Sequence, residues 1–124
     1  MNAKNAINWF ELAVSDLPRA RKFYETVFRC SLQEFAAPDH VMAMFPFDMT
    51  GGVGGCLTLM AGMNPGPGGT VVYLNADGDL DGVIARVTPA GGGVLKPKTG
   101  IGEHGHIAII RDTEGNVVGV HAYR

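Results

Sequence analysis

The sequence predicts a small α+β domain made of two βαβββ modules, and three observations support that fold class. A strand followed by an amphipathic helix occurs twice, near the N-terminus and again after residue 70. Three further strand candidates follow each helix. Residues 61–69 (AGMNPGPGG) separate the halves, and their glycines and prolines cannot sustain regular structure. We therefore expect one domain over 1–124, with module 1 at about 5–60 and module 2 at about 70–124.

The first module begins with a strand over 8–14, where side chains alternate between two faces. Apolar residues at helical spacing then predict an amphipathic helix over about 17–28. Three more strands are expected to complete the module, at 32–35, 40–47 and 56–60.

The second module repeats this order. A strand is expected over 71–76, followed by a helix whose apolar residues recur at i, i+3, i+4 and i+7, namely Leu80, Val83, Ile84 and Val87. Pro89 and the glycines after it end that helix. The remaining strands are expected at 94–96, 106–111 and 117–123, the last two joined by a turn over 112–116. Two such sheets can cover each other's open faces and leave a concave space between them.

The bulk properties exclude several classes of function. The net charge is −2 and no basic run is present, so neither nucleic acid nor an anionic membrane is an expected partner. The apolar runs are too short to span a membrane, and the N-terminus lacks the apolar core of a signal peptide. A cytoplasmic location with reduced Cys30 and Cys56 is therefore expected.

Two motifs carry a family resemblance. The segment WFELAVSDLPRARKFYETVF resembles the opening strand and helix of vicinal oxygen chelate proteins, the superfamily of glyoxalases, bleomycin-resistance proteins and extradiol dioxygenases. The ending DTEGNVVGVH is similar to that family's final hairpin. The resemblance implies paired βαβββ modules that form a cupped sheet around a small-molecule site, and it implies a homodimer.

The resemblance also implies where a metal ion would bind. In metal-dependent members, the first and last strands of each module each supply one His, Gln or Glu ligand. Carried over to this sequence, these positions are Trp9, about Cys56, about Val71 and Gly119. Three of the four cannot bind a divalent ion through their side chains, and one cysteine is not a site. We therefore expect no metal and no cofactor.

Strand alternation defines the side chains that would face the cup. Apolar Phe10, Leu12 and Val14 suit the helix side, so their neighbours face the opposite way. The expected ligand-binding residues are Trp9, Cys56, Thr58, Tyr73, Asn75, Gly119 and, in addition, His106. An unidentified small organic molecule is the expected partner.

Glu11 and His121 are the candidate catalytic residues. A carboxylate in an apolar strand is costly to bury, so Glu11 is either exposed to water or a ligand-contacting group or general base. His121 is expected to contact a ligand more readily than to act as a base. His104 and His106 could join His121 in a relocated metal site, a less favoured alternative. The thiol of Cys56 is expected to be buried and inert.

Three hypotheses follow. The leading one is a metal-independent small-molecule-binding or resistance-type protein. The second is a metal-independent lyase or isomerase that acts on a small carbonyl compound through Glu11 with Tyr73 or His121. The third is a metalloenzyme that uses the three histidines.

Overall fold

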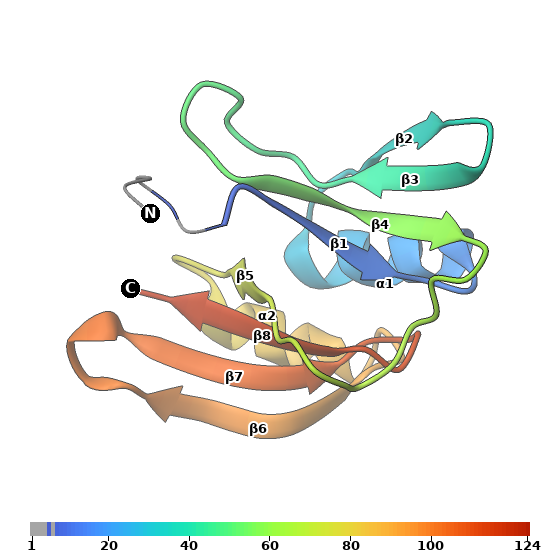
Figure 1. The fold of residues 1–124 in the computed structure, drawn as a ribbon. Coiled ribbons are helices and arrows are strands. Elements are labelled where there is room, and N and C mark those ends of the chain that lie inside the picture. The colour runs from blue at the N-terminus through green and yellow to red at the C-terminus, as the bar shows by residue number, and fades with distance from the viewer. Residues whose placement is uncertain (1–4, 6) are drawn as a thin grey trace.

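A computed structural model describes residue 5 and residues 7–124 (Figure 1). The elements of the first module are β1 (Trp9–Ala13), α1 (Leu17–Phe28), β2 (Gln33–Ala36), β3 (His40–Met44) and β4 (Gly54–Met60). Those of the second are β5 (Tyr73–Asn75), α2 (Leu80–Val87), β6 (Gly93–Gly100), the 3₁₀ turn η1 (Gly102–His104), β7 (His106–Arg111) and β8 (Val117–Ala122). The predicted α+β fold with two βαβββ modules is confirmed.

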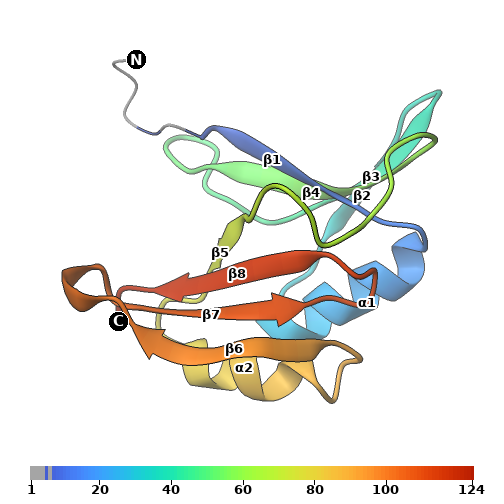
Figure 2. The same cartoon turned by 60° about the horizontal axis from the view of Figure 1, so that its bottom comes forward.

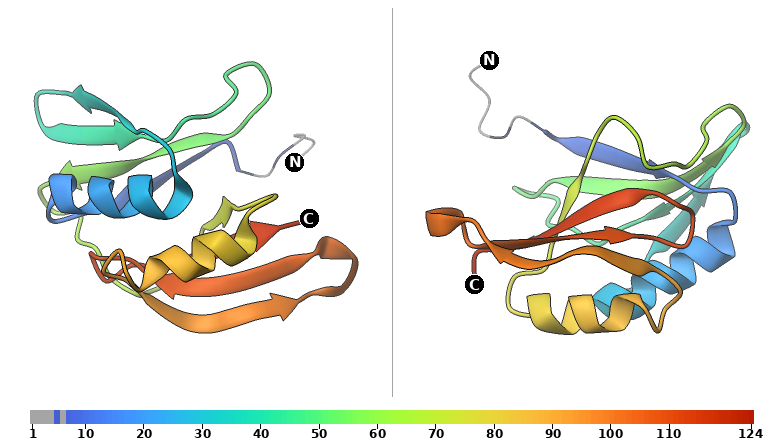
Figure 3. Two further views of the ribbon diagram at one scale, coloured as in Figure 1. Left: turned by 180° about the vertical axis from the view of Figure 1, so that it is seen from behind. Right: turned by 90° about the horizontal axis from the view of Figure 1, so that it is seen from below.

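Each module forms its own four-stranded sheet with the same topology. The strand orders are β1-β4-β3-β2 and β5-β8-β7-β6, and in each sheet the first strand pairs with the last in parallel. Figure 2 shows the two sheets as separate layers, and β1 and β5 are edge strands of their sheets. The helices lie on the same side of the molecule, which leaves the other sheet faces open (Figure 3).

Helix α1 forms because its sequence combines an N-cap with an apolar stripe. The side chain of Asp16 accepts a hydrogen bond from the backbone N–H of Arg19, and Pro18 occupies the first turn, where its missing N–H costs nothing. The stripe buries five side chains in the core: Leu17, Ala20, Phe23, Tyr24 and Val27. Helix α2 buries Leu80, Val83 and Val87 in the same core and contacts α1.

The strands show the alternation that the sequence indicates. Leu12, Ala43 and Leu57 lie opposite one another on paired strands and are buried against the helices. In the second module, Ala108 and Val120 are paired and fully buried. The open faces of both sheets therefore carry the remaining side chains, including Glu11 and His121.

Strands β4 and β6 are longer than expected, and β3 and β5 are shorter. Strand β4 begins at Gly54, which pairs with Trp9, and the aromatic rings of Phe47 and Phe10 lie where side chains on Gly54 and Gly55 would be. Strand β6 runs over eight residues despite Pro97, because it is an edge strand and its register shifts on either side of Lys96.

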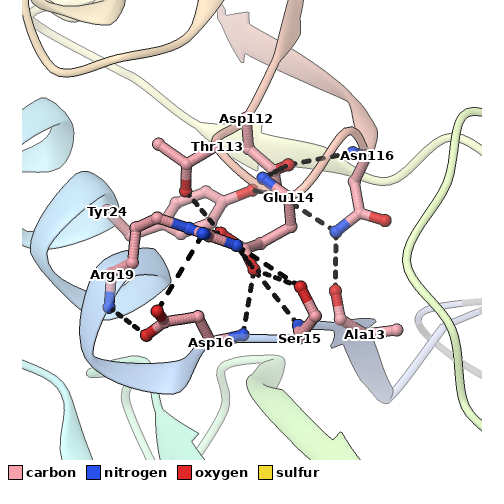
Figure 4. A network of polar contacts seen from close by, with 9 residues as sticks. All are labelled: Ala13, Ser15, Asp16, Arg19, Tyr24, Asp112, Thr113, Glu114 and Asn116. Carbon is pink, nitrogen blue, oxygen red and sulfur yellow. Dashed lines mark hydrogen bonds and ion pairs between the residues drawn. The ribbon is translucent and has the colours of Figure 1, made fainter.

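The turn before β8 joins the modules through a polar network that we call the inter-module clamp (Figure 4). The network links the 112–116 turn to residues 13–19 and to Tyr24 of the first module. Buried Asp112 accepts four hydrogen bonds: from the Tyr24 hydroxyl at 2.7 Å, from the backbone N–H of Glu114 and Asn116, and from the Asn116 side chain.

Glu114 is the second carboxylate of the clamp, and its side chain is fully buried. It accepts hydrogen bonds from the backbone N–H groups of Ser15 and Asp16 and from the guanidinium of Arg19 at 2.8 Å. Burial acts to raise the pKa of Glu114, but the bonds from Arg19, Thr113 and the two N–H groups outweigh it and lower that pKa to about 2. The clamp therefore holds the two modules together at one end.

None of the helices in the described part of the chain is long and apolar enough to cross a membrane.

Candidate functional site

The candidate site lies along the inter-module seam, which we define as β1 together with residues 71–75. Both β1 and β5 are edge strands of their sheets, and two cavities lie between the modules along them. Val72 borders both cavities. The linker over 61–69 passes from β4 to β5 on the side of the molecule away from the helices (Figure 1).

The larger cavity is an open cleft of about 940 Å³. Its lining is mainly apolar and aromatic, and it includes Phe10, Phe28, Phe45, Val71, Tyr73 and Asn75. Cavities of this size, with mostly apolar walls and a few polar groups, are typical of small-molecule sites.

The smaller pocket has a volume of about 300 Å³ and a different chemical character. One wall comes from β1 and includes Glu11, and the other includes Asn116 from the clamp. The linker completes it through Met63, Asn64, Gly66, Gly68 and Thr70. The backbone N–H of Gly66 donates to the Asn116 side chain at 2.9 Å, which fixes the linker over this pocket.

Glu11 is part of a hydrogen-bonded chain on the open face of the first sheet. The register pairs Glu11 with Cys56, and Ala13 with Thr58, so all four share one face. The Thr58 hydroxyl donates to the Glu11 carboxylate at 2.6 Å. This bond uses the only hydroxyl proton of Thr58. The Cys56 thiol lies 3.2 Å from the same hydroxyl oxygen and therefore donates to it.

The Cys56 thiol is buried, as the sequence indicates. Burial is the largest influence on the pKa of Cys56 and raises it, and the charge of Glu11 adds to this. A thiol with a raised pKa is a poor nucleophile.

The register gives the cross-strand neighbours of two of the four positions carried over from the resemblance. Trp9 pairs with Gly54 in the first module, and Gly119 pairs with Tyr73 in the second. Both glycines are covered by aromatic rings, Gly54 by Phe47 and Gly119 by Tyr73.

The histidines do not converge. The register places His121 beside Asn75 on the open face, whereas His106 pairs with Ala122 and points to the helix side. His121 Nε2 lies 2.7 Å from the backbone carbonyl of His104, whose own side chain is exposed. In residues 7–124 and at residue 5, no three His, Cys, Asp or Glu side chains are grouped to hold a metal ion.

The other predicted site residues fall into separate environments. Tyr73 and Asn75 line the larger cleft, whereas Glu11 lines the smaller pocket. His121 lines neither cavity, so the structure does not bring the two candidate catalytic residues into one pocket. The linker residues and Asn116 were missed by sequence reasoning, because a Gly/Pro-rich segment signals irregular structure but not which surface it crosses.

Comparisons with known proteins agree with this architecture. Residues 6–120 match the family described as Glyoxalase/Bleomycin resistance protein/Dioxygenase superfamily. The chain is 32% identical over 120 residues to CFP32 of Mycobacterium tuberculosis (strain CDC 1551 / Oshkosh), a protein named provisionally as a glyoxylase. The same identity holds for CFP32 of Mycobacterium bovis. The match covers 91% of this chain but 44% of each relative, so the chain spans less than half of their length.

Solved structures show the same fold. A glyoxylase/bleomycin resistance protein/dioxygenase domain from Frankia sp. EAN1pec superposes with a TM-score of 0.73 at 19% identity, covering 98% of this chain and all of that domain. A glyoxalase I mutant from Zea mays gives a TM-score of 0.69 at 22% identity, covering 93% of this chain and 45% of that one. With the family match over nearly the whole chain, these findings establish that the protein belongs to the Glyoxalase/Bleomycin resistance protein/Dioxygenase superfamily.

Proposed function

We propose that the protein binds a small organic molecule at the inter-module seam without a metal ion. The observation that carries the proposal is the open cleft of about 940 Å³ between the modules, whose walls are mainly apolar and aromatic.

The four positions that the resemblance assigns to metal ligands hold residues that do not fit a divalent ion: Trp9, about Cys56, about Val71 and Gly119. The side chains of Trp9, Val71 and Gly119 offer no ligand atom, and a single thiol is not a metal site. The ring of Tyr73 also lies over Gly119, in the space that a ligand side chain there would need. These features favour an organic ligand over a metal ion.

The larger cleft has the properties of an organic-ligand site. Its aromatic walls favour contact with an apolar body, and the phenol of Tyr73 and the amide of Asn75 can orient polar groups. Its volume of about 940 Å³ leaves room for a molecule of metabolite size. To bind or sequester such a molecule, the protein needs no catalytic group in addition to these contacts.

The proposal predicts that Val71→Phe weakens ligand binding about tenfold. Val71 lines the cleft and is largely exposed, so a larger side chain there narrows the cavity without disturbing the core. The measurement is the titration of ¹⁵N-labelled protein in a chelating buffer with benzyl alcohol, phenylacetamide and 4-hydroxybenzamide. At least one of these compounds is expected to shift the amide signals of residues 71–75 and 54–55 saturably.

The matched control is Val94→Phe, because Val94 has similar exposure but lies on β6, outside both cavities. The Val94→Phe protein should bind the three compounds with the same affinities as the wild type. Shifts confined to other parts of the chain, or a Val71→Phe protein that binds as tightly as the wild type, would contradict the proposed site.

A further inference from the structure

Among the described residues that line the smaller pocket, Glu11 is the only ionisable one. The linker sequence over 61–69 carries no charge. Glu11 is exposed to the pocket and forms no ion pair within residue 5 and residues 7–124. The described part of the pocket therefore presents a carboxylate without a countercharge.

The bonds around Glu11 also determine which groups it can accept. Thr58 is almost completely buried and donates its only hydroxyl proton to one carboxylate oxygen, Oε1, at 2.6 Å. The second oxygen, Oε2, has no hydrogen-bond donor among the described residues, so a ligand can supply one.

The opposite wall reinforces the negative character of the pocket. Asn116 donates its side-chain N–H groups to the carbonyl of Ala13 and to Asp112, and its oxygen accepts from Gly66. Its donors are thus already used, and the carboxylate of Asp112 lies directly behind it. A ligand that enters this pocket meets oxygen acceptors on β1 and no side-chain cation among the described lining residues.

We propose that the pocket under the linker binds the ammonium or guanidinium group of a cationic ligand, with Glu11 as its counterion. This assignment rests on the proposed function and specifies its ligand class, because it gives the small molecule a positively charged end. A charged N–H donor matches the open oxygen of Glu11 in both charge and hydrogen bonding. The pocket volume of about 300 Å³ admits such a head group with a few attached carbons.

The test compares benzylamine, which is cationic at neutral pH, with benzyl alcohol, its neutral counterpart of nearly the same shape. Both are titrated into the ¹⁵N-labelled chain of 124 residues. Benzylamine is expected to shift the amide signals of Gly66, Gly68 and Asn116, and to bind there about tenfold more tightly than benzyl alcohol. Glu11→Gln should remove that preference, because it deletes the charge and keeps an oxygen that can accept from Thr58.

Glu34→Gln is the matched control, because it deletes the same charge from β2, an edge strand away from both cavities. It should leave the benzylamine affinity unchanged, and the thermal transition of each variant shows that it is folded. Equal binding of the two compounds under the linker, or a Glu11→Gln protein with wild-type affinity for benzylamine, would overturn the assignment. Binding of both compounds in the larger cleft alone would refute the cation site but leave the proposed function intact. Binding of neither compound at the inter-module seam would refute both the cation site and the proposed function.

Discussion

Asp112→Ala is expected to lower the free energy of unfolding by about 3–5 kcal/mol, which would remove much of the stability of a domain this size. Asp112 is buried and accepts hydrogen bonds from Tyr24, from Asn116 and from the backbone of its own turn. Alanine leaves these donors buried without partners, and each unsatisfied donor costs about 1–3 kcal/mol. Urea unfolding followed by circular dichroism measures the loss.

Tyr24→Phe is the graded control for this prediction. It removes one hydrogen bond of the same network and keeps the ring in the core, so a loss of about 1 kcal/mol is expected. The pKa of Tyr24 is raised well above its ordinary value, chiefly by burial, so the hydroxyl stays protonated and donates throughout. An Asp112→Ala protein as stable as Tyr24→Phe would show that the clamp does not join the modules.

Glu114→Gln is expected to destabilise the protein by about 3 kcal/mol at neutral pH, and the difference should disappear in acid. The pKa of Glu114 in the folded protein is about 2, below its ordinary value of 4.5. A lowered pKa means that the carboxylate contributes stability above about pH 4.5, and that this contribution is lost as the pH falls through about 2. Each tenfold difference in proton affinity corresponds to about 1.4 kcal/mol.

Urea unfolding of both proteins at several pH values between about 7 and 2 tests this. The two stabilities should converge as the pH falls, because a protonated Glu114 loses its charged bonds to Arg19, as glutamine does. Asp81→Asn is a suitable control, since its carboxylate pairs with Lys98 on the exposed surface and should contribute little. A constant difference between wild type and Glu114→Gln across this range would refute the role given to its charge.

Periodicity was sufficient to predict the fold. The i, i+3, i+4 apolar spacing located both helices, and alternation correctly assigned Leu12 to the core and Glu11 to the open face. These patterns are local, because a residue's neighbours along the chain determine which face it occupies.

The site depends on relations that the sequence does not contain. The register of β1 on β4 places Gly54 beside Trp9 and Cys56 beside Glu11, and no local signal in the sequence fixes this pairing. The path of the linker over Glu11 depends on the bond from Gly66 to Asn116, fifty residues away. The side chains of His106 and His121 lie on opposite faces of the sheet, and this likewise depends on the pairing of β7 with β8.

The proposal that the site binds its ligand without a metal ion is tested most directly by metal content. The measurement is elemental analysis of protein purified without chelators, followed by calorimetric titration with Zn²⁺, Ni²⁺, Mn²⁺ and Fe²⁺. We predict far less than one equivalent of each as purified, and no tight binding on titration, because the positions that the resemblance assigns to the ligands hold Trp9, Cys56, Val71 and Gly119, which supply no set of ligands. About one equivalent of a tightly held divalent ion, lost when the seam is mutated, would contradict a metal-independent site.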